Sequence, residues 1–172
     1  VDELGRPNGL VFNMGYGIQG DSRYTHVPAM LEMSGVPYTG ADPLGHAVSL
    51  DKVITKILIA DAGVPTPRYA VLRDASDPIG ELTYPLIVKP RHESTSFGLQ
   101  VVRDEPSLRA AVAAIVATYR QDALVEEFID GSEYCVALLG NAANGTVETL
   151  PIVEMDFGNR ELNALTWADK FH

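Results

Sequence analysis

The sequence predicts a mixed α/β fold (α+β), with a compact α/β unit followed by strands that pair in antiparallel fashion. Short apolar segments of strand length at residues 69–72, 85–89 and 99–102 precede a segment with helical periodicity. After residue 123 the pattern changes to consecutive strand-like segments around an Asn-Gly turn at 144–145, which is typical of antiparallel hairpins. These observations favour a compact α/β unit followed by antiparallel hairpins.

Composition supports a globular chain and limits its partners. The 172 residues are 46% apolar, which is enough for a buried core. The net charge of −10 disfavours a broad nucleic-acid or anionic membrane surface, since such surfaces use clustered Lys and Arg. No run of apolar residues approaches the length of about 20 residues that a helix needs to cross a bilayer. We therefore expect a cytoplasmic protein without nucleic-acid or membrane partners, in which any anion site is local.

The lone cysteine, Cys135, excludes an internal disulfide. Because it lies in a strand-like segment, and free cysteines are usually buried, we expect a buried structural thiol.

The first 46 residues are expected to be the end of an N-terminal domain. Residues 10–13 have the pattern of a short buried strand. Apolar residues at helical spacing predict a helix over 27–34, which Gly35 ends. A turn-rich segment then favours a domain boundary near Gly45.

The next unit is expected at residues 47–122. Ser49 or Asp51 is placed to cap a helix with an apolar stripe, which Gly63 ends. Three strands follow, and Asp104 opens a second helix with acidic residues and an early proline. The core face of that helix is predicted to hold Leu108, Val112, Ile115, Val116 and Tyr119.

The segment around Lys89 has the most informative pattern. A strand brings Lys89 to its end, Pro90 stops the strand, and a hydroxyl-rich loop follows that ends at Gly98. Lys89 alone fits an exposed edge residue equally well, because lysines usually stay exposed. The order of the features favours a polyphosphate site with Thr95 and Ser96 as donors and Lys89 as a point cation. The spacing of a Walker A loop is absent.

A second segment, residues 126–133, carries polar groups at the end of a strand. Its backbone N–H and C=O groups suit the edge of a purine, and the Glu133 carboxylate suits ribose hydroxyls. The alternative is a strand with a solvated acidic rim, since acidic residues are mostly exposed.

Taken in order, these segments resemble the ATP-binding signature of the ATP-grasp superfamily. Residues 37–40, 50–52 and 62–67 resemble, more narrowly, the D-alanine–D-alanine ligase family. The resemblance implies an incomplete ATP-grasp fold that follows the end of a Rossmann-like domain. The implied units are the end of an N-terminal substrate domain (1–46), the central ATP-grasp subdomain (47–122) and the start of the C-terminal ATP-grasp subdomain (123–172).

The resemblance also implies roles for single residues. Lys52 and Lys89 would contact the α- and β-phosphates, Thr95 and Ser96 would lie in the loop that closes on the nucleotide, and Lys170 would reach the phosphates from a mobile segment. Lys89, Thr95 and Lys170 would act in catalysis. The implied contacts to the nucleoside are Glu126 at the adenine amino group, Glu127 and Ile129 through their backbone, Phe128 as a wall of the adenine pocket, and Glu133 on the ribose.

The implied activity is that of an ATP-dependent ligase that joins a carboxylate to an amine through an acylphosphate, using ATP and Mg²⁺ on small amino acids. In the family this reaction serves peptidoglycan synthesis and cell wall biogenesis. The family's Mg²⁺ ligands, an Asp and a Glu-x-Asn pair, are expected beyond His172. We therefore predict no metal ligand within the 172 residues and no catalysis by them alone.

Three departures from the family pattern leave the substrate open. Ser94 stands where glycine is usual, Thr95 where serine is usual, and Phe171 where tyrosine is frequent. An amino-acid ligase of peptide natural-product synthesis and a non-catalytic ATP-binding module therefore remain as alternatives. The sequence also leaves open whether the protein forms a homo-oligomer.

Overall fold

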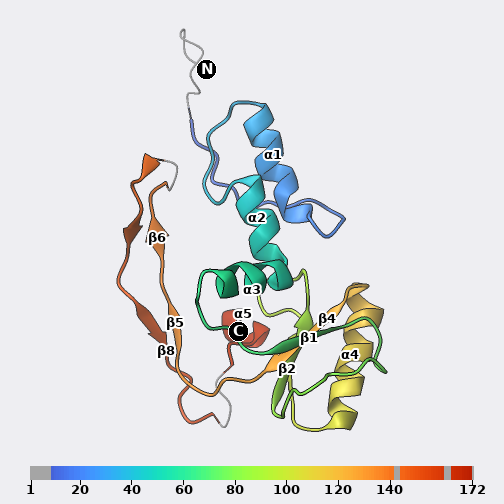
Figure 1. The fold of residues 1–172 in the computed structure, drawn as a ribbon. Helices are drawn as coiled ribbons and strands as arrows, with labels where there is room; N and C mark the ends of the chain where they lie inside the picture. The colour runs from blue at the N-terminus through green and yellow to red at the C-terminus, as the bar shows by residue number, and fades with distance from the viewer. Residues whose placement is uncertain (1–8, 142–143, 161–163, 172) are drawn as a thin grey trace.

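The computed structural model describes residues 9–141, 144–160 and 164–171 (Figure 1). The helices are α1 (His26–Met33), α2 (Pro43–Leu50), α3 (Lys52–Asp61), α4 (Glu105–Tyr119) and α5 (Trp167–Phe171), with a 3-10 turn, η1 (Arg23–Thr25), before α1. The strands are β1 (Tyr69–Leu72), β2 (Leu86–Pro90), β3 (Gln100–Val102), β4 (Ala123–Glu127), β5 (Glu133–Cys135), β6 (Leu138–Leu139), β7 (Glu148–Thr149) and β8 (Val153–Met155).

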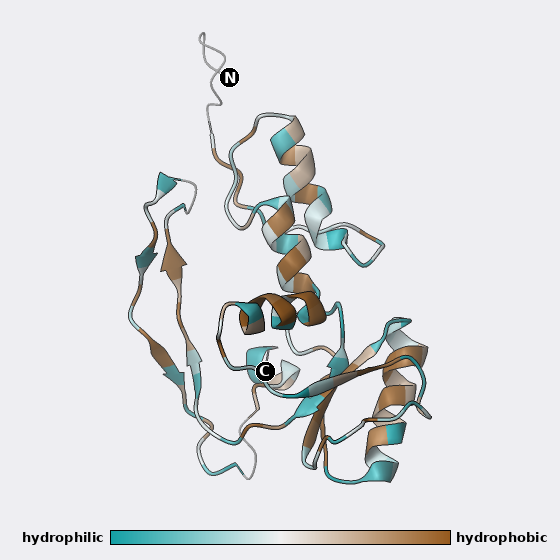
Figure 2. Ribbon diagram, in the orientation of Figure 1, coloured by the Kyte–Doolittle hydropathy of each residue, from teal (hydrophilic) through white to brown (hydrophobic). Residues whose placement is uncertain are grey.

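Four of these strands form the central sheet in the order β1-β4-β2-β3, and each neighbouring pair is antiparallel. Helix α4 packs on one face of this sheet, and Figure 2 shows brown apolar residues along both. The core between them is fully apolar because successive strand residues alternate between the two faces. Its members are Leu72, Leu86, Val88, Val102, Leu108, Ala111, Val112, Ile115, Ala123 and Val125.

Helix α4 begins as its sequence predicts. The Asp104 side chain accepts from the Ser107 amide at 2.9 Å, which satisfies a free N–H of the first turn. Leu108, Val112 and Ile115 are buried against the sheet, with Val116 and Tyr119 packed at the edge of the same core. The predicted core face of this helix is therefore confirmed.

The N-terminal segment differs from its predicted form. Val11 makes only an isolated parallel bridge with Tyr38, and Leu10 and Phe12 are 64% and 74% exposed. The prediction of a short buried strand at 10–13 was wrong because only one neighbouring segment of the described chain pairs with it. The helix predicted at 27–34 is confirmed as α1, and Gly35 follows it at φ +65°.

Helices α2 and α3 meet at Asp51. The Asp51 carboxylate accepts from the amides of Val53 and Ile54 at 3.0 and 3.2 Å, so it is the N-cap of α3. Ser49, the other predicted cap, lies inside α2, which Asp42 caps instead. Figure 1 shows α3 lying across the sheet on the side away from α4.

The chain after β4 forms one long antiparallel hairpin, as the Asn-Gly turn predicts (Figure 1). Strand β5 pairs with β8, and β6 pairs with β7. Cys135 is exposed on β5, so the prediction of a buried thiol was wrong. The two-stranded ribbon has no helix packed on it among the described residues, and most of its strand side chains are therefore exposed (Figure 1).

Candidate functional site

Four charged side chains meet between α3 and the face of the sheet opposite α4. Because Leu86 and Val88 point into the core, Lys89 points to the other face, where Glu126 of β4 also lies. Helix α3 places Lys52 and Lys56 four residues apart, so both project from one side of the helix toward this face. A cavity of about 250 Å³ lies among them, lined also by Ser49, Thr55, Thr66, Pro67 and Leu124.

Glu126 is the single carboxylate that lines this cavity, and two lysines share it. Lys56 Nζ donates to Oε2 at 3.0 Å, and Lys89 Nζ donates to Oε1. Burial pushes the pKa of the Glu126 carboxyl upward, but the charge of Lys89, together with hydrogen bonds from both lysines, outweighs it and lowers the pKa below its usual value. Glu126 is therefore ionised, and the site carries three lysines against one negative charge.

Lys52 holds the start of the polar loop, which we define as residues 91–98. Its Nζ donates to the carbonyl oxygens of Pro90 at 3.0 Å and Arg91 at 3.2 Å, and to that of Glu93. Burial, and next the nearby charge of Lys89, lower the pKa of Lys52 to about 8. Two lysines held this close repel each other, which favours the entry of an anion.

The polar loop faces a second cavity of about 190 Å³, which Lys52 and Lys89 also line. Thr95 and Ser96 both have positive φ, 56° and 61°, a backbone conformation that costs energy in residues other than glycine. The remaining lining residues are Glu93, Ser94, Phe97 and Leu99. The hydroxyl-bearing residues predicted from the sequence and the two predicted phosphate lysines thus surround one space.

The C-terminal helix α5 contacts this loop. Ser96 Oγ donates to the Leu165 carbonyl at 2.7 Å and accepts from Lys170 Nζ at 3.0 Å. The rings of Phe97 and Trp167 stack with their centroids 5.9 Å apart. Lys170 therefore lies at the polar loop in this structure, and its contact with nucleotide phosphates stays a prediction.

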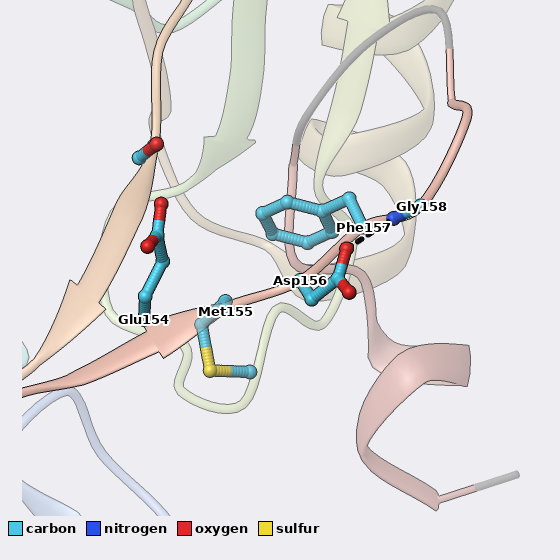
Figure 3. A pocket seen from close by; sticks show the side chains of 6 residues that line it. Glu154, Met155, Asp156, Phe157 and Gly158 are labelled. Atoms are coloured by element: carbon cyan, nitrogen blue, oxygen red, sulfur yellow. Dashed lines mark hydrogen bonds between the residues drawn. The ribbon is translucent and has the colours of Figure 1, made fainter.

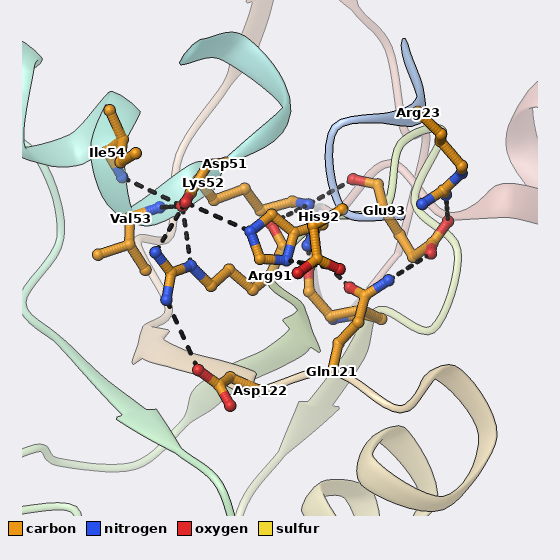
Figure 4. A network of polar contacts seen from close by, with 12 residues as sticks. Arg23, Asp51, Lys52, Val53, Ile54, Arg91, His92, Glu93, Gln121 and Asp122 are labelled. Carbon is orange, nitrogen blue, oxygen red and sulfur yellow. Dashed lines mark hydrogen bonds and ion pairs between the residues drawn. The ribbon is translucent and has the colours of Figure 1, made fainter. Parts of the chain in front are cut away.

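A polar network fixes the base of the loop (Figure 4). Arg91 donates to both oxygens of Asp51, at 2.9 and 2.7 Å, and pairs with Asp122 at 3.6 Å. His92 Nε2 lies 3.3 Å from Asp51. Burial would raise the pKa of Asp51, but the hydrogen bonds from Arg91 and from the helix amides hold it well below its usual range.

The same network reaches the N-terminal segment through Glu93. Its carboxylate accepts from Arg23 at 2.8 Å and from Gln121 at 2.8 Å (Figure 4). The side chains of Arg23 and Glu93 are each only 15% exposed. Segments from three parts of the chain thus converge on the residue that begins the hydroxyl-rich stretch.

The predicted nucleoside residues beyond Glu126 line neither of these two cavities. Glu127 pairs with the exposed guanidinium of Arg68, and Ile129 is 64% exposed. The Phe128 amide donates to the carbonyl of Pro85 at 3.1 Å. Glu133 accepts from the Leu165 amide at 3.2 Å, so its carboxylate is turned toward the segment before α5. Their predicted contacts with adenine and ribose remain predictions.

The sequence reading missed Lys56 and the network around Asp51 and Arg91. The signal for Lys56 was its position four residues after Lys52 on a predicted helix, which places both on one side. The partners of Asp51 lie 40 and 41 residues away in sequence, so local spacing gave no sign of them.

A larger cavity, of about 470 Å³, lies at the hairpin (Figure 3). It is lined by Ser132, Glu154, Met155, Asp156, Phe157 and Gly158, and no cationic side chain is among them. Glu154 accepts from the Tyr134 hydroxyl at 3.3 Å and Asp156 from the Gly158 amide at 2.8 Å. Two carboxylates repel phosphate oxygens, so this cavity suits a nucleotide less well than the smaller space between the lysines.

No helix in the described part of the chain is long and apolar enough to cross a membrane. Over the same residues, no cluster of three His, Cys, Asp or Glu side chains is arranged to hold a metal ion.

A family model and individual sequence relatives both relate this chain to D-alanine–D-alanine ligases. A family model described as "D-ala D-ala ligase C-terminus" matches residues 58–160. An uncharacterised protein of Sinorhizobium fredii is 55% identical over 170 residues, which cover 99% of this chain and 50% of that protein. The D-alanine–D-alanine ligase of Xanthomonas axonopodis pv. citri is 38% identical over 147 residues, 82% of this chain and 46% of the ligase.

Solved structures agree with the sequence relatives. The D-alanine–D-alanine ligase of Coxiella burnetii matches with a TM-score of 0.70 and 27% identity, over 85% of this chain and 44% of that one. The ligase of Bacillus anthracis in complex with ATP matches with a TM-score of 0.63 and 25% identity, over 78% of this chain and 44% of that one.

The antiparallel sheet, the helices on it and the hairpin that follows are those of the ATP-grasp fold, as predicted. Within that class, the chain belongs to the D-alanine–D-alanine ligase family. It spans about half the length of the curated relatives that it matches.

Proposed function

We propose that this chain is the ATP-binding part of an ATP-dependent ligase that joins a carboxylate to an amine. The observation that carries the proposal is the excess of positive charge between α3 and the sheet, where Lys52, Lys56 and Lys89 face the one carboxylate of Glu126. A polyphosphate is the ligand that this charge suits, and the loop hydroxyls beside it suit phosphate oxygens.

In the proposed reaction the carboxylate of one amino acid attacks the γ-phosphorus of ATP, and the bond to the β-phosphate oxygen breaks. The products are an acylphosphate and ADP. The amine of a second amino acid then attacks the acyl carbon, loses a proton, and expels inorganic phosphate as the C–N bond forms. Lys89 and Lys52 would neutralise the charge on the phosphates, and the polar loop with Lys170 would exclude water.

Thr95 and Ser96 would face the transferred phosphate from the polar loop. Their positive φ angles are the kind of backbone strain that occurs at ligand-binding loops. Glu126 would meet the adenine amino group, with the backbone of Glu127 and Ile129, the ring of Phe128 and the Glu133 carboxylate completing the nucleoside site. The division at residues 1–46, 47–122 and 123–172 belongs to the same proposal.

Magnesium, which the family implies, does not fit the described residues of this pocket. Glu126 is committed to two lysines, and Glu93 to Arg23 and Gln121. Mg²⁺ needs hard oxygen ligands, which lysines cannot supply. No step of the proposal therefore passes through a metal ion held by these residues.

The binding part of the proposal is tested by calorimetric titration of the chain with ATP, wild type against Lys89→Ala. We expect wild type to bind and the variant to bind about tenfold or more weakly, because a charge next to the phosphates is lost. Arg109→Ala is the matched control, since it removes a cation of α4 that donates to Glu105 and to the Asp77 carbonyl. Equal affinity in Lys89→Ala and wild type, with both folded by circular dichroism, would refute the site.

The ligase reaction is tested on the whole encoded protein by phosphate release from ATP with D- and L-amino acids. Release that depends on two amino acids supports the ligase, and the preferred pair separates a D-alanine ligase from a ligase of peptide natural products. ATP binding without release under any pair would instead identify a non-catalytic nucleotide module.

A further inference from the structure

We infer that Lys56 is a positioning residue that frees Lys89 for the nucleotide by keeping Glu126 neutralised. The inference rests on the proposed function, because it assigns a task to a residue that touches no phosphate in that proposal. It comes from the way two lysines share one buried carboxylate.

The two lysines differ in how firmly they are held. The Lys56 side chain is 8% exposed, donates to Thr66 Oγ1 at 2.7 Å and to Glu126 Oε2 at 3.0 Å, and lies 5.1 Å above the ring of Tyr69. The Lys89 side chain is 22% exposed, and Glu126 Oε1 is the one hydrogen-bond partner that the structure gives it. The Lys56 ammonium is thus held by three contacts, whereas Lys89 would have to break only one hydrogen bond to move.

Lys89 also faces both cavities, one on the Glu126 side and one on the side of the polar loop. Lys56 lines only the first. When phosphates enter, Lys89 is therefore the lysine that can turn from the carboxylate to the ligand.

Such a turn would be unfavourable if Lys89 were the only partner of Glu126. A buried carboxylate without a cation is strongly unfavourable, so it either takes up a proton or keeps its cationic partner. With Lys56 in place, the Glu126 carboxylate still has one cationic partner and one hydrogen bond after Lys89 leaves. Lys89 and Lys52 can then bind the phosphates while the buried Glu126 carboxylate remains paired with a cation.

The test uses inorganic tripolyphosphate as the probe, since it has the charge of the ligand and no adenine for Glu126 to contact. Affinity is measured by calorimetry at pH 7.5 without divalent cations. In Lys56→Met we expect affinity about tenfold weaker than wild type, because Glu126 now retains Lys89. Lys56→Arg restores the charge and is expected to recover most of the affinity. Arg109→Met, which also removes one positive charge, is the control and is expected to bind as wild type does.

Two readouts separate positioning from a general structural role. First, Lys56→Met combined with Glu126→Gln is expected to bind more tightly than Lys56→Met alone, because no carboxylate remains to hold Lys89. Second, release of Lys89 in Lys56→Met requires a proton on Glu126, so the ratio of its Kd to that of wild type should shrink as the pH falls from 8 to 6. Titration of the probe itself cancels in this ratio.

The inference is overturned if folded Lys56→Met binds tripolyphosphate as tightly as wild type, or if the double variant stays as weak as the single one. If Lys56→Met does not fold, Glu126→Gln is compared with the double variant, and unequal affinities then overturn it. Failure of the proposed function looks different: wild type itself does not bind the probe or ATP, or Lys89→Ala binds both unchanged.

Discussion

Binding of ATP is expected to take up protons at pH 8, because Lys52 titrates there. Burial, and next the charge of Lys89, lower the pKa of Lys52 from its ordinary 10.5 to about 8. At a pH equal to the pKa, half of the Lys52 amines are neutral. A polyphosphate beside the group favours the ammonium form and raises its pKa again, so each bound ATP should take up as much as about 0.5 proton at pH 8.

The same shift fixes the direction of the pH dependence. Between about pH 8 and the ordinary pKa of 10.5, free protein has lost the Lys52 proton that the complex keeps, so affinity falls as pH rises, by at most about tenfold per unit. The folding stability of the ligand-free protein has the opposite pH dependence to its ATP affinity. The unfolded chain holds this proton more tightly than the folded one, so the Lys52 contribution to stability increases as pH rises through this range.

The uptake is measured by titration calorimetry at pH 8.0 in two phosphate-free buffers with different ionisation enthalpies. The difference between the observed binding enthalpies gives the number of protons exchanged. Lys52→Arg stays charged throughout this range, so its uptake should vanish while binding persists. An enthalpy independent of the buffer in wild type, or a release of protons, would refute the reasoning about Lys52.

Two predictions concern the elements that hold the loop. Asp51→Ala removes the cap of α3 and leaves Arg91 without its bidentate partner, so its free energy of unfolding in urea should fall by about 3 kcal/mol. Asp42→Ala, which removes only the exposed cap of α2, should cost about 1 kcal/mol. Equal losses in the two variants would contradict the role of the ion pair. Gly98→Ala places a Cβ at a residue with φ +71° and 2.9 Å from the rings of Pro90 and Tyr119. It should lower the free energy of unfolding by more than about 1 kcal/mol and weaken ATP binding. Gly131→Ala is the control, because nothing lies within 4 Å of its Cβ, and its melting temperature should not change. An unchanged melting temperature in Gly98→Ala would show that the loop base is looser than described.

Local patterns predicted the regular elements of the fold well. The core face of α4 follows from its 3.6-residue periodicity, and the ends of β2 follow from apolar residues that stop at Pro90. The failed predictions involve burial that local sequence does not determine. Cys135 lies in a strand as expected, but the face it occupies is open because nothing in the described chain covers that ribbon.

The candidate site was predictable to the extent that its residues follow one another in the chain. Lys89 and the hydroxyls of the polar loop lie in one continuous segment, so their order carried the signal. The contacts of Lys52 with three loop carbonyls and the shared carboxylate of Glu126 join residues far apart in sequence. These contacts depend on the strand order β1-β4-β2-β3, which periodicity alone does not specify.

The stacking of Trp167 on Phe97 gives the protein an internal optical reporter. Trp167 is the only tryptophan in the sequence. Its ring stacks on Phe97 of the polar loop, and Lys170 donates a hydrogen bond to Ser96 of the same loop. Tryptophan emission therefore comes from a single position beside the lysine-lined space. Movement of the loop on its ligand should change the intensity or wavelength of that emission, which makes loop closure measurable in rapid mixing without any added label.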